Sequence, residues 1–177
     1  MSIWEIVPDS NKYDRLDPVV DAGDHIAFIN MFVGRPISNS WLPIEVKIDS
    51  ADFPSDFPSL PGGMPPVFTE KALYVLNPLI QNCIEALPLR NQSMALFAIN
   101  VLDVIDCLDH EHSQLVRSPS SGKVLMIKRY SFYDRCTDNH EIFKIPEMLM
   151  NHIYVGDKFK SVVEDNKLGG LRFVQVA

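Results

Sequence analysis

The stretch DFPSDFPSLPGGMPP, residues 52–66, holds five of the thirteen prolines in the chain and repeats the tetrapeptide Asp-Phe-Pro-Ser. Proline fixes its own φ and biases the residue before it toward extended backbone, so we expect no helix here. Phe53 and Phe57 follow this repeat and can serve as apolar anchors. We predict a stiff extended strap that these aromatics hold against a domain, and a polyproline segment that recognises a partner is the alternative.

Hydrophobic patterns on both sides of the strap predict short strands and helices. Residues 3–7 and 41–48 are typical of strands, and residues 24–32 fit a helix better than a buried strand. The continuous apolar run at 94–101 predicts a central buried strand. Further strands are predicted at 124–132, 141–145, 153–155 and 171–176, and a helix at 157–166.

A helix is also predicted directly after the strap. Thr69 is a suitable N-cap, and apolar residues follow helical spacing from Glu70 to Cys83. Asn77 and Pro78 either kink this helix or start a second one.

Length and composition indicate one globular domain. The chain has 177 residues, of which 46% are hydrophobic and 22% charged, as in ordinary globular proteins. Short strands mixed with few helices predict an α+β fold, in which a mixed or mainly antiparallel sheet is flanked by a few helices.

The compartment and the class of ligand follow from charge and hydropathy. The start of the chain lacks the features of a secretory signal, and no apolar stretch approaches the roughly 20 residues of a membrane helix, so we expect a cytoplasmic protein that does not bind membranes. The formal net charge of −7 disfavours nucleic acid and suits a basic protein partner, although solubility alone also explains it. The three widely spaced cysteines predict free thiols in a reducing compartment.

The segment DVIDCLDHEHSQ, residues 103–114, resembles a metal site in composition only. His110 and His112 would point to opposite faces of a strand and would not share a helical face. The i, i+4 histidine pair of a zinc helix is absent. We therefore expect no metal and no other cofactor.

The same segment predicts a negative surface patch. No Lys or Arg lies between Arg90 and Arg117, so exposed carboxylates there can steer a basic partner. An ordinary solvated surface is the alternative. The four acidic residues are Asp103, Asp106, Asp109 and Glu111.

Catalytic motifs are weak. The chain lacks a Gly-x-Ser-x-Gly elbow, and SPSSGK, residues 118–123, lacks the glycine spacing of a phosphate loop and predicts a hairpin loop instead. Cys136 and His140 could form a nucleophile and base, but the sequence places no third group to orient them. The basic residues between Arg117 and Arg135 are too sparse for a nucleic-acid reader.

Several phrases occur in a fixed order that resembles one family of bacterial immunity proteins, "immunity protein eleven". Besides Trp4 and LPL (87–89), they are GRPISNSWLPIEVKI (34–48), FPSLPGGMPPVFTEKALYVL (57–76), INVLDVIDCLDHEHSQL (99–115), IFKIPEM (142–148) and IYVGDKFKSVVEDNKLGGLRFVQV (153–176). The repeated Asp-Phe-Pro-Ser and the histidines at 110 and 112 depart from the family pattern.

The resemblance implies a role without catalysis. Such proteins belong to polymorphic toxin systems, in which the immunity protein binds a cognate toxin or secreted effector and blocks it. It also implies that residues 57–177 are the family core, and that residues 1–56 add N-terminal strands and the strap to the same fold. We expect the acidic residues at 103, 106, 109 and 111 to contact the toxin. A small intracellular hydrolase and a scaffold or oligomerisation module are the alternatives, and the oligomeric state stays open.

Overall fold

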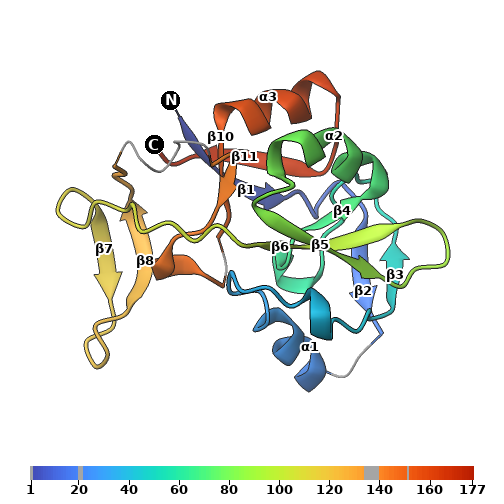
Figure 1. The fold of residues 1–177 in the computed structure, drawn as a ribbon, viewed down its shortest axis with the longest axis horizontal. Coiled ribbons are helices and arrows are strands. Elements are labelled where there is room, and N and C mark those ends of the chain that lie inside the picture. The colour runs from blue at the N-terminus through green and yellow to red at the C-terminus, as the bar shows by residue number, and fades with distance from the viewer. Residues whose placement is uncertain (1, 20–21, 134–139, 151) are drawn as a thin grey trace.

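A computed structural model describes residues 2–19, 22–133, 140–150 and 152–177, and its described part is an α+β fold of helices and small sheets (Figure 1). The helices are α1 (Ala22–Ile29), α2 (Glu70–Ile80) and α3 (Asp157–Asp165). The strands are β1 (Ile3–Pro8), β2 (Arg15–Pro18), β3 (Val46–Asp49), β4 (Val67–Thr69), β5 (Ile84–Leu89), β6 (Leu96–Val101), β7 (Gln114–Arg117), β8 (Val124–Arg129), β9 (Ile142–Phe143), β10 (Tyr154–Gly156) and β11 (Leu171–Gln175). The predicted fold class is confirmed, and the strands form four sheets, all antiparallel.

The largest sheet joins the two ends of the chain. Its strand order is β11-β1-β10-β9, so the N-terminal strand lies between two C-terminal strands. Glu5 of β1 is opposite Tyr154 on one side and opposite Val174 on the other. Both termini consequently lie at the same side of the molecule (Figure 1).

A second sheet has β6 at its centre, between β4 and β5. The predicted buried strand is confirmed in β6, where Ala98 and Val101 are fully buried. Strand β5 was not predicted, because the helical spacing of α2 continues as far as Cys83. Pro88 is incompatible with a continued helix, and it is tolerated in β5 because that strand is at the edge of its sheet.

Helix α2 packs its apolar face into the main core. The predicted N-cap is confirmed, since the Thr69 hydroxyl accepts a hydrogen bond from the Ala72 amide at 3.2 Å. Ala72, Leu76 and Ile80 are fully buried. The helix continues through Pro78, so the alternative of a second helix is wrong.

The strap belongs to the domain, as predicted, and it is not helical except for a short 3-10 turn at Pro61–Gly63. Phe57 is 2% exposed and packs edge-on against Phe68, with ring centroids 4.9 Å apart. Phe53 is 54% exposed and contacts the Tyr13 ring, so only the second aromatic is a core anchor. The two copies of the tetrapeptide therefore have different roles.

Hydrogen bonds attach the strap to segments that are distant in sequence. The Ser59 carbonyl accepts from the Leu16 amide at 2.9 Å. Asp56 donates its amide to the Gly169 carbonyl, and its carboxylate accepts from the Gly169 amide, both at 2.9 Å. A Cβ on Gly170, whose φ is +111°, would lie 2.1 Å from the Ser55 hydroxyl, so this close approach requires glycine.

Lys144 is a buried cation that connects two loops. Its side chain is almost completely buried, and Nζ donates to the carbonyls of Phe32 and of Leu149, the latter at 2.9 Å. Both partners are neutral, so burial is not offset by a carboxylate. Desolvation lowers the pKa of Lys144 from 10.5 to about 8.

We predict that Lys144 makes the stability of the fold rise with pH in the alkaline range. Between pH 8 and 10.5 the unfolded chain keeps the Lys144 proton and the folded chain loses it, so the free energy of unfolding increases with pH. Relative to Lys144→Met, wild type should gain roughly 3 kcal/mol across this window. Urea unfolding at several pH values measures the difference, and parallel pH profiles for the two proteins would contradict the assignment.

Candidate functional site

The acidic turn, residues 103–112, crosses from the end of β6 to the β7–β8 hairpin. The Ile105 amide donates to the Lys144 carbonyl, and the Lys144 amide donates to the Asp103 carbonyl. Further along, the Asp109 amide donates to the Ser131 carbonyl at 2.8 Å. The turn is thus fixed at both ends by backbone hydrogen bonds. Leu108 packs inward, whereas Val104 is partly exposed.

Asp109 organises the turn and presents little surface to a partner. Its side chain is buried, and the residue is only 8% exposed. Its carboxylate accepts hydrogen bonds from the amides of Glu111 and His112 and pairs with His112 Nδ1 at 2.6 Å. Although desolvation opposes the effect, these bonds lower the pKa of Asp109 below its ordinary value.

Asp103 also has partners within the protein. Its carboxylate pairs with His140 Nδ1 at 2.7 Å. It also lies beside the buried thiol of Cys83, and burial together with Asp103 raises the pKa of Cys83 to about 12. The exposed members of the predicted patch are Asp106 and Glu111.

The two histidines of the turn do not converge. His110 Nε2 pairs with Glu147, which precedes β10, and His110 Nδ1 lies 3.4 Å from Arg117. His112 pairs with Asp109 instead. Among the described residues, no group of three His, Cys, Asp or Glu side chains is placed to hold a metal ion.

The thiol and imidazole groups near Asp103 are arranged unfavourably for nucleophilic catalysis. A nucleophile is activated when the base lies between it and the carboxylate. Here the carboxylate of Asp103 lies between the Cys83 thiol and His140, so the thiol is held protonated. The nucleophile considered from the sequence, Cys136, lies outside the described residues. Cys107 takes part in a disulfide, so the prediction of free thiols is wrong for that residue.

The β7–β8 hairpin follows the acidic turn and forms one end of the long axis of the molecule (Figure 1). The predicted hairpin loop at 118–123 is confirmed, because it joins these two antiparallel strands. The turn and the hairpin are connected by Arg129, which donates to the His112 carbonyl at 3.2 Å. This hydrogen bond holds the base of the hairpin next to the turn.

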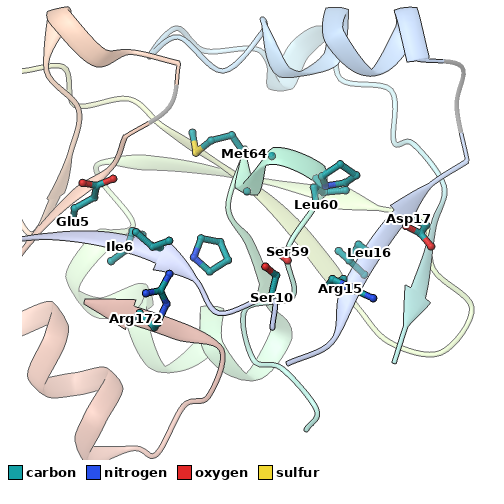
Figure 2. A pocket seen from close by; sticks show the side chains of 15 residues that line it. Glu5, Ile6, Ser10, Arg15, Leu16, Asp17, Ser59, Leu60, Met64 and Arg172 are labelled. Atoms are coloured by element: carbon teal, nitrogen blue, oxygen red, sulfur yellow. The ribbon is translucent and has the colours of Figure 1, made fainter. Parts of the chain in front are cut away.

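A recess of about 410 Å³ lies between β1, β2 and the strap. Figure 2 shows Glu5 and Arg172 toward one end and Arg15 and Asp17 toward the other. Glu5 pairs with His152, and Arg15 pairs with Asp49, so two of these four charges are already compensated. This recess could not be predicted from the sequence, because its walls come from segments that are distant in the chain.

Within the recess, the Ser59 hydroxyl is buried and has no hydrogen-bond partner among the described residues. Apolar side chains of the strap and of the neighbouring strands surround it. The recess can accept a small polar group, but it brings no nucleophile and base together.

In the part of the chain that the structure describes, no helix has the length and apolar character needed to cross a bilayer. A comparison with models of known protein families identifies the family of the chain. The model of an immunity protein family, Imm11, matches residues 81–177, which is more than half of the chain. The chain therefore belongs to the Imm11 immunity protein family, and no curated protein matches it.

We predict that Asp109 contributes to stability, whereas its neighbour Glu111 does not. Asp109→Ala removes the acceptor of two backbone amides and should lower Tm by about 2–4 °C. Glu111→Gln removes the same charge from an exposed side chain and serves as the matched control. Thermal unfolding monitored by circular dichroism distinguishes them. Equal Tm values for the two variants would show that the buried carboxylate is dispensable.

Proposed function

We propose that this protein neutralises a cognate bacterial toxin or secreted effector by binding to it, without chemistry of its own. The observation that carries the proposal is the Imm11 match over residues 81–177. The matched region contains the acidic turn, the hairpin and the last three strands of the large sheet. A stable complex of this kind would bury roughly 1,200–2,000 Å² in total.

The chemistry of the described residues favours binding over a hydrolase activity. An activated thiol requires a lowered pKa, and the pKa of Cys83 is raised instead. The Asp103 carboxylate accepts from His140 Nδ1 at 2.7 Å and orients that imidazole, but the Cys83 thiol beside the same carboxylate is held protonated. These contacts stabilise the connection between β6 and β9, and Cys83, Asp103 and His140 do not line the recess.

The acidic turn is our proposed steering surface for the toxin. Asp106 and Glu111 are exposed and can attract a basic patch on the partner. Asp103 and Asp109 are less exposed, and their hydrogen bonds help to hold the turn in place. Electrostatic complementarity at such positions raises the association rate more than the lifetime of a complex.

An immunity protein must be present in the compartment where its toxin acts. The sequence predicts the cytoplasm, whereas the disulfide at Cys107 is more typical of an oxidising compartment. We propose the cytoplasm of the toxin-producing cell as the site of action. Fractionation of cells that carry an epitope-tagged chain tests this, and recovery in the periplasm would contradict it.

Co-expression tests the function directly. The toxin domain encoded beside the gene for this chain is expressed from an inducible promoter, with or without the immunity protein. We expect survival only with the immunity protein, together with co-purification of the two chains. Wild-type chain that neither binds the toxin nor restores growth would overturn the proposed function.

Charge reversal tests the steering surface. In Asp106→Lys/Glu111→Lys, the association rate at low salt should fall by about tenfold, with little change in the dissociation rate. Asp52→Lys/Asp165→Lys makes the same change at two exposed acids elsewhere. Surface plasmon resonance at two salt concentrations measures both rates. Identical association rates for the two double variants would exclude the turn as the steering surface.

A further inference from the structure

The β7–β8 hairpin has basic side chains and no acidic ones, although the protein as a whole is acidic. Residues 113–133 contain no Asp or Glu, whereas the whole chain has a formal net charge of −7. All of its basic side chains are exposed. They are Arg117, Lys123, Lys128 and Arg129.

The hairpin also exposes apolar side chains next to these charges. Leu125 is 60% exposed and Met126 is 54% exposed, whereas Ile127 is 8% exposed and packs into the core beneath the hairpin. Exposed methionine beside basic residues is typical of protein interfaces, where Met and Arg are enriched. Strand β8 therefore exposes two apolar side chains that basic residues flank in the sequence.

Two bulges in β8 explain this exposure. Arg117 is opposite Val124 and Val116 is opposite Met126, so Leu125 is an extra residue on β8. Leu115 is opposite Ile127 and Gln114 is opposite Arg129, so Lys128 is a second extra residue. Bulges redirect side chains away from the regular alternation of a strand. They also discourage simple strand addition at this edge.

The hairpin is held in one conformation before any partner arrives. At its tip, the Ser118 amide donates to the Lys123 carbonyl at 2.8 Å, and the Gly122 amide donates to the Ser118 carbonyl at 2.9 Å. The Arg117 guanidinium donates to the Gly122 carbonyl at 3.1 Å. At its base, Leu115 and Ile127 pack against the core. Little conformational entropy would be lost on docking.

We propose that the hairpin is the arm that this immunity protein inserts into its toxin, in an apolar socket whose rim carries Asp and Glu side chains. The proposal rests on the proposed function and names the partner chemistry for a surface distinct from the acidic turn. Charge complementarity favours an acidic rim, because the exposed Lys123, Lys128 and Arg129 flank Leu125 and Met126 in the sequence. A toxin with an acidic socket beside a basic patch would match hairpin and turn together.

Nucleic acid fits this surface less well. Single strands bind to aromatic platforms that offer free ring faces. Tyr130 and Phe132 at the base of the hairpin stack on each other at 5.5 Å and contact the buried Tyr154. The acidic turn next to the hairpin would also repel phosphates.

The electrostatic part is tested with Lys123→Glu/Lys128→Glu. Neither lysine side chain forms a hydrogen bond or ion pair with the described residues, so the fold should be retained. The matched control is Lys12→Glu/Lys158→Glu, which reverses two exposed lysines elsewhere. We expect the hairpin variant to bind the toxin domain about 100-fold more weakly, with a smaller salt dependence, and the control to bind like wild type.

The apolar part is tested with Leu125→Gln/Met126→Gln. The control, Leu42→Gln/Tyr74→Gln, replaces two exposed apolar side chains outside the hairpin. We expect dissociation of the hairpin variant to accelerate by about tenfold or more, and that of the control to stay unchanged. Circular dichroism verifies that all four double variants are folded.

The outcomes separate the two proposals. If wild type does not protect cells against the toxin, the proposed function fails and the arm fails with it. If wild type protects and both hairpin variants bind and protect equally well, only the arm is overturned. Binding of a fluorescent random DNA duplex that is lost in Lys123→Glu/Lys128→Glu, with unchanged toxin affinity, would assign the hairpin to nucleic acid and also overturn it.

Discussion

The pairing of β1 between β10 and β11 is the constraint on which the rest of the structure depends. Every backbone group of a central strand needs partners on both sides, and here those partners come from the opposite end of the chain. The strap reinforces this closure, because Asp56 binds the Gly169 backbone just before β11 begins. Strand β1, which precedes the family-matched region, is thus part of the same sheet as β10 and β11. The matched segment alone would leave β10 and β11 without their shared neighbour.

Local chemistry predicted those parts of the fold that depend on neighbouring residues. Proline restriction predicted the extended strap, and the hydroxyl of Thr69 predicted the start of α2. The missed strand β5 shows the limit of such reasoning, since its pairing with β6 is decided by tertiary contacts that override helical spacing. The repeated tetrapeptide shows the same limit. Phe53 is exposed and Phe57 is buried, although both occupy the same position of the repeat, because only Phe57 packs against the ring of Phe68.

The residue types of the candidate site could be predicted from the sequence, but the role of each residue could not. The four acidic residues in this turn indicated a negative patch. The sequence did not reveal that His140 pairs with Asp103, or that the Asp109 carboxylate accepts hydrogen bonds from the backbone of the turn. Those partners are decided by the path of the chain between β6 and β9. The positive hairpin was visible as a run of basic residues, and the bulges that expose Leu125 were not, since they arise from a register that only the folded pair has.

A rigid surface of opposite charges is well suited to a protein that acts by occupying another protein. Flexible charged loops would have to be ordered on binding, and each immobilised side chain would reduce the affinity. In this fold Arg117 at the end of β7 lies next to His110 of the turn, which itself pairs with Glu147. Arg129 joins the hairpin to the His112 carbonyl. Because these contacts fix the spacing between negative and positive groups, the toxin that we propose as partner would have to match both at once. Under that proposal, specificity for one toxin would follow from geometry as well as from charge.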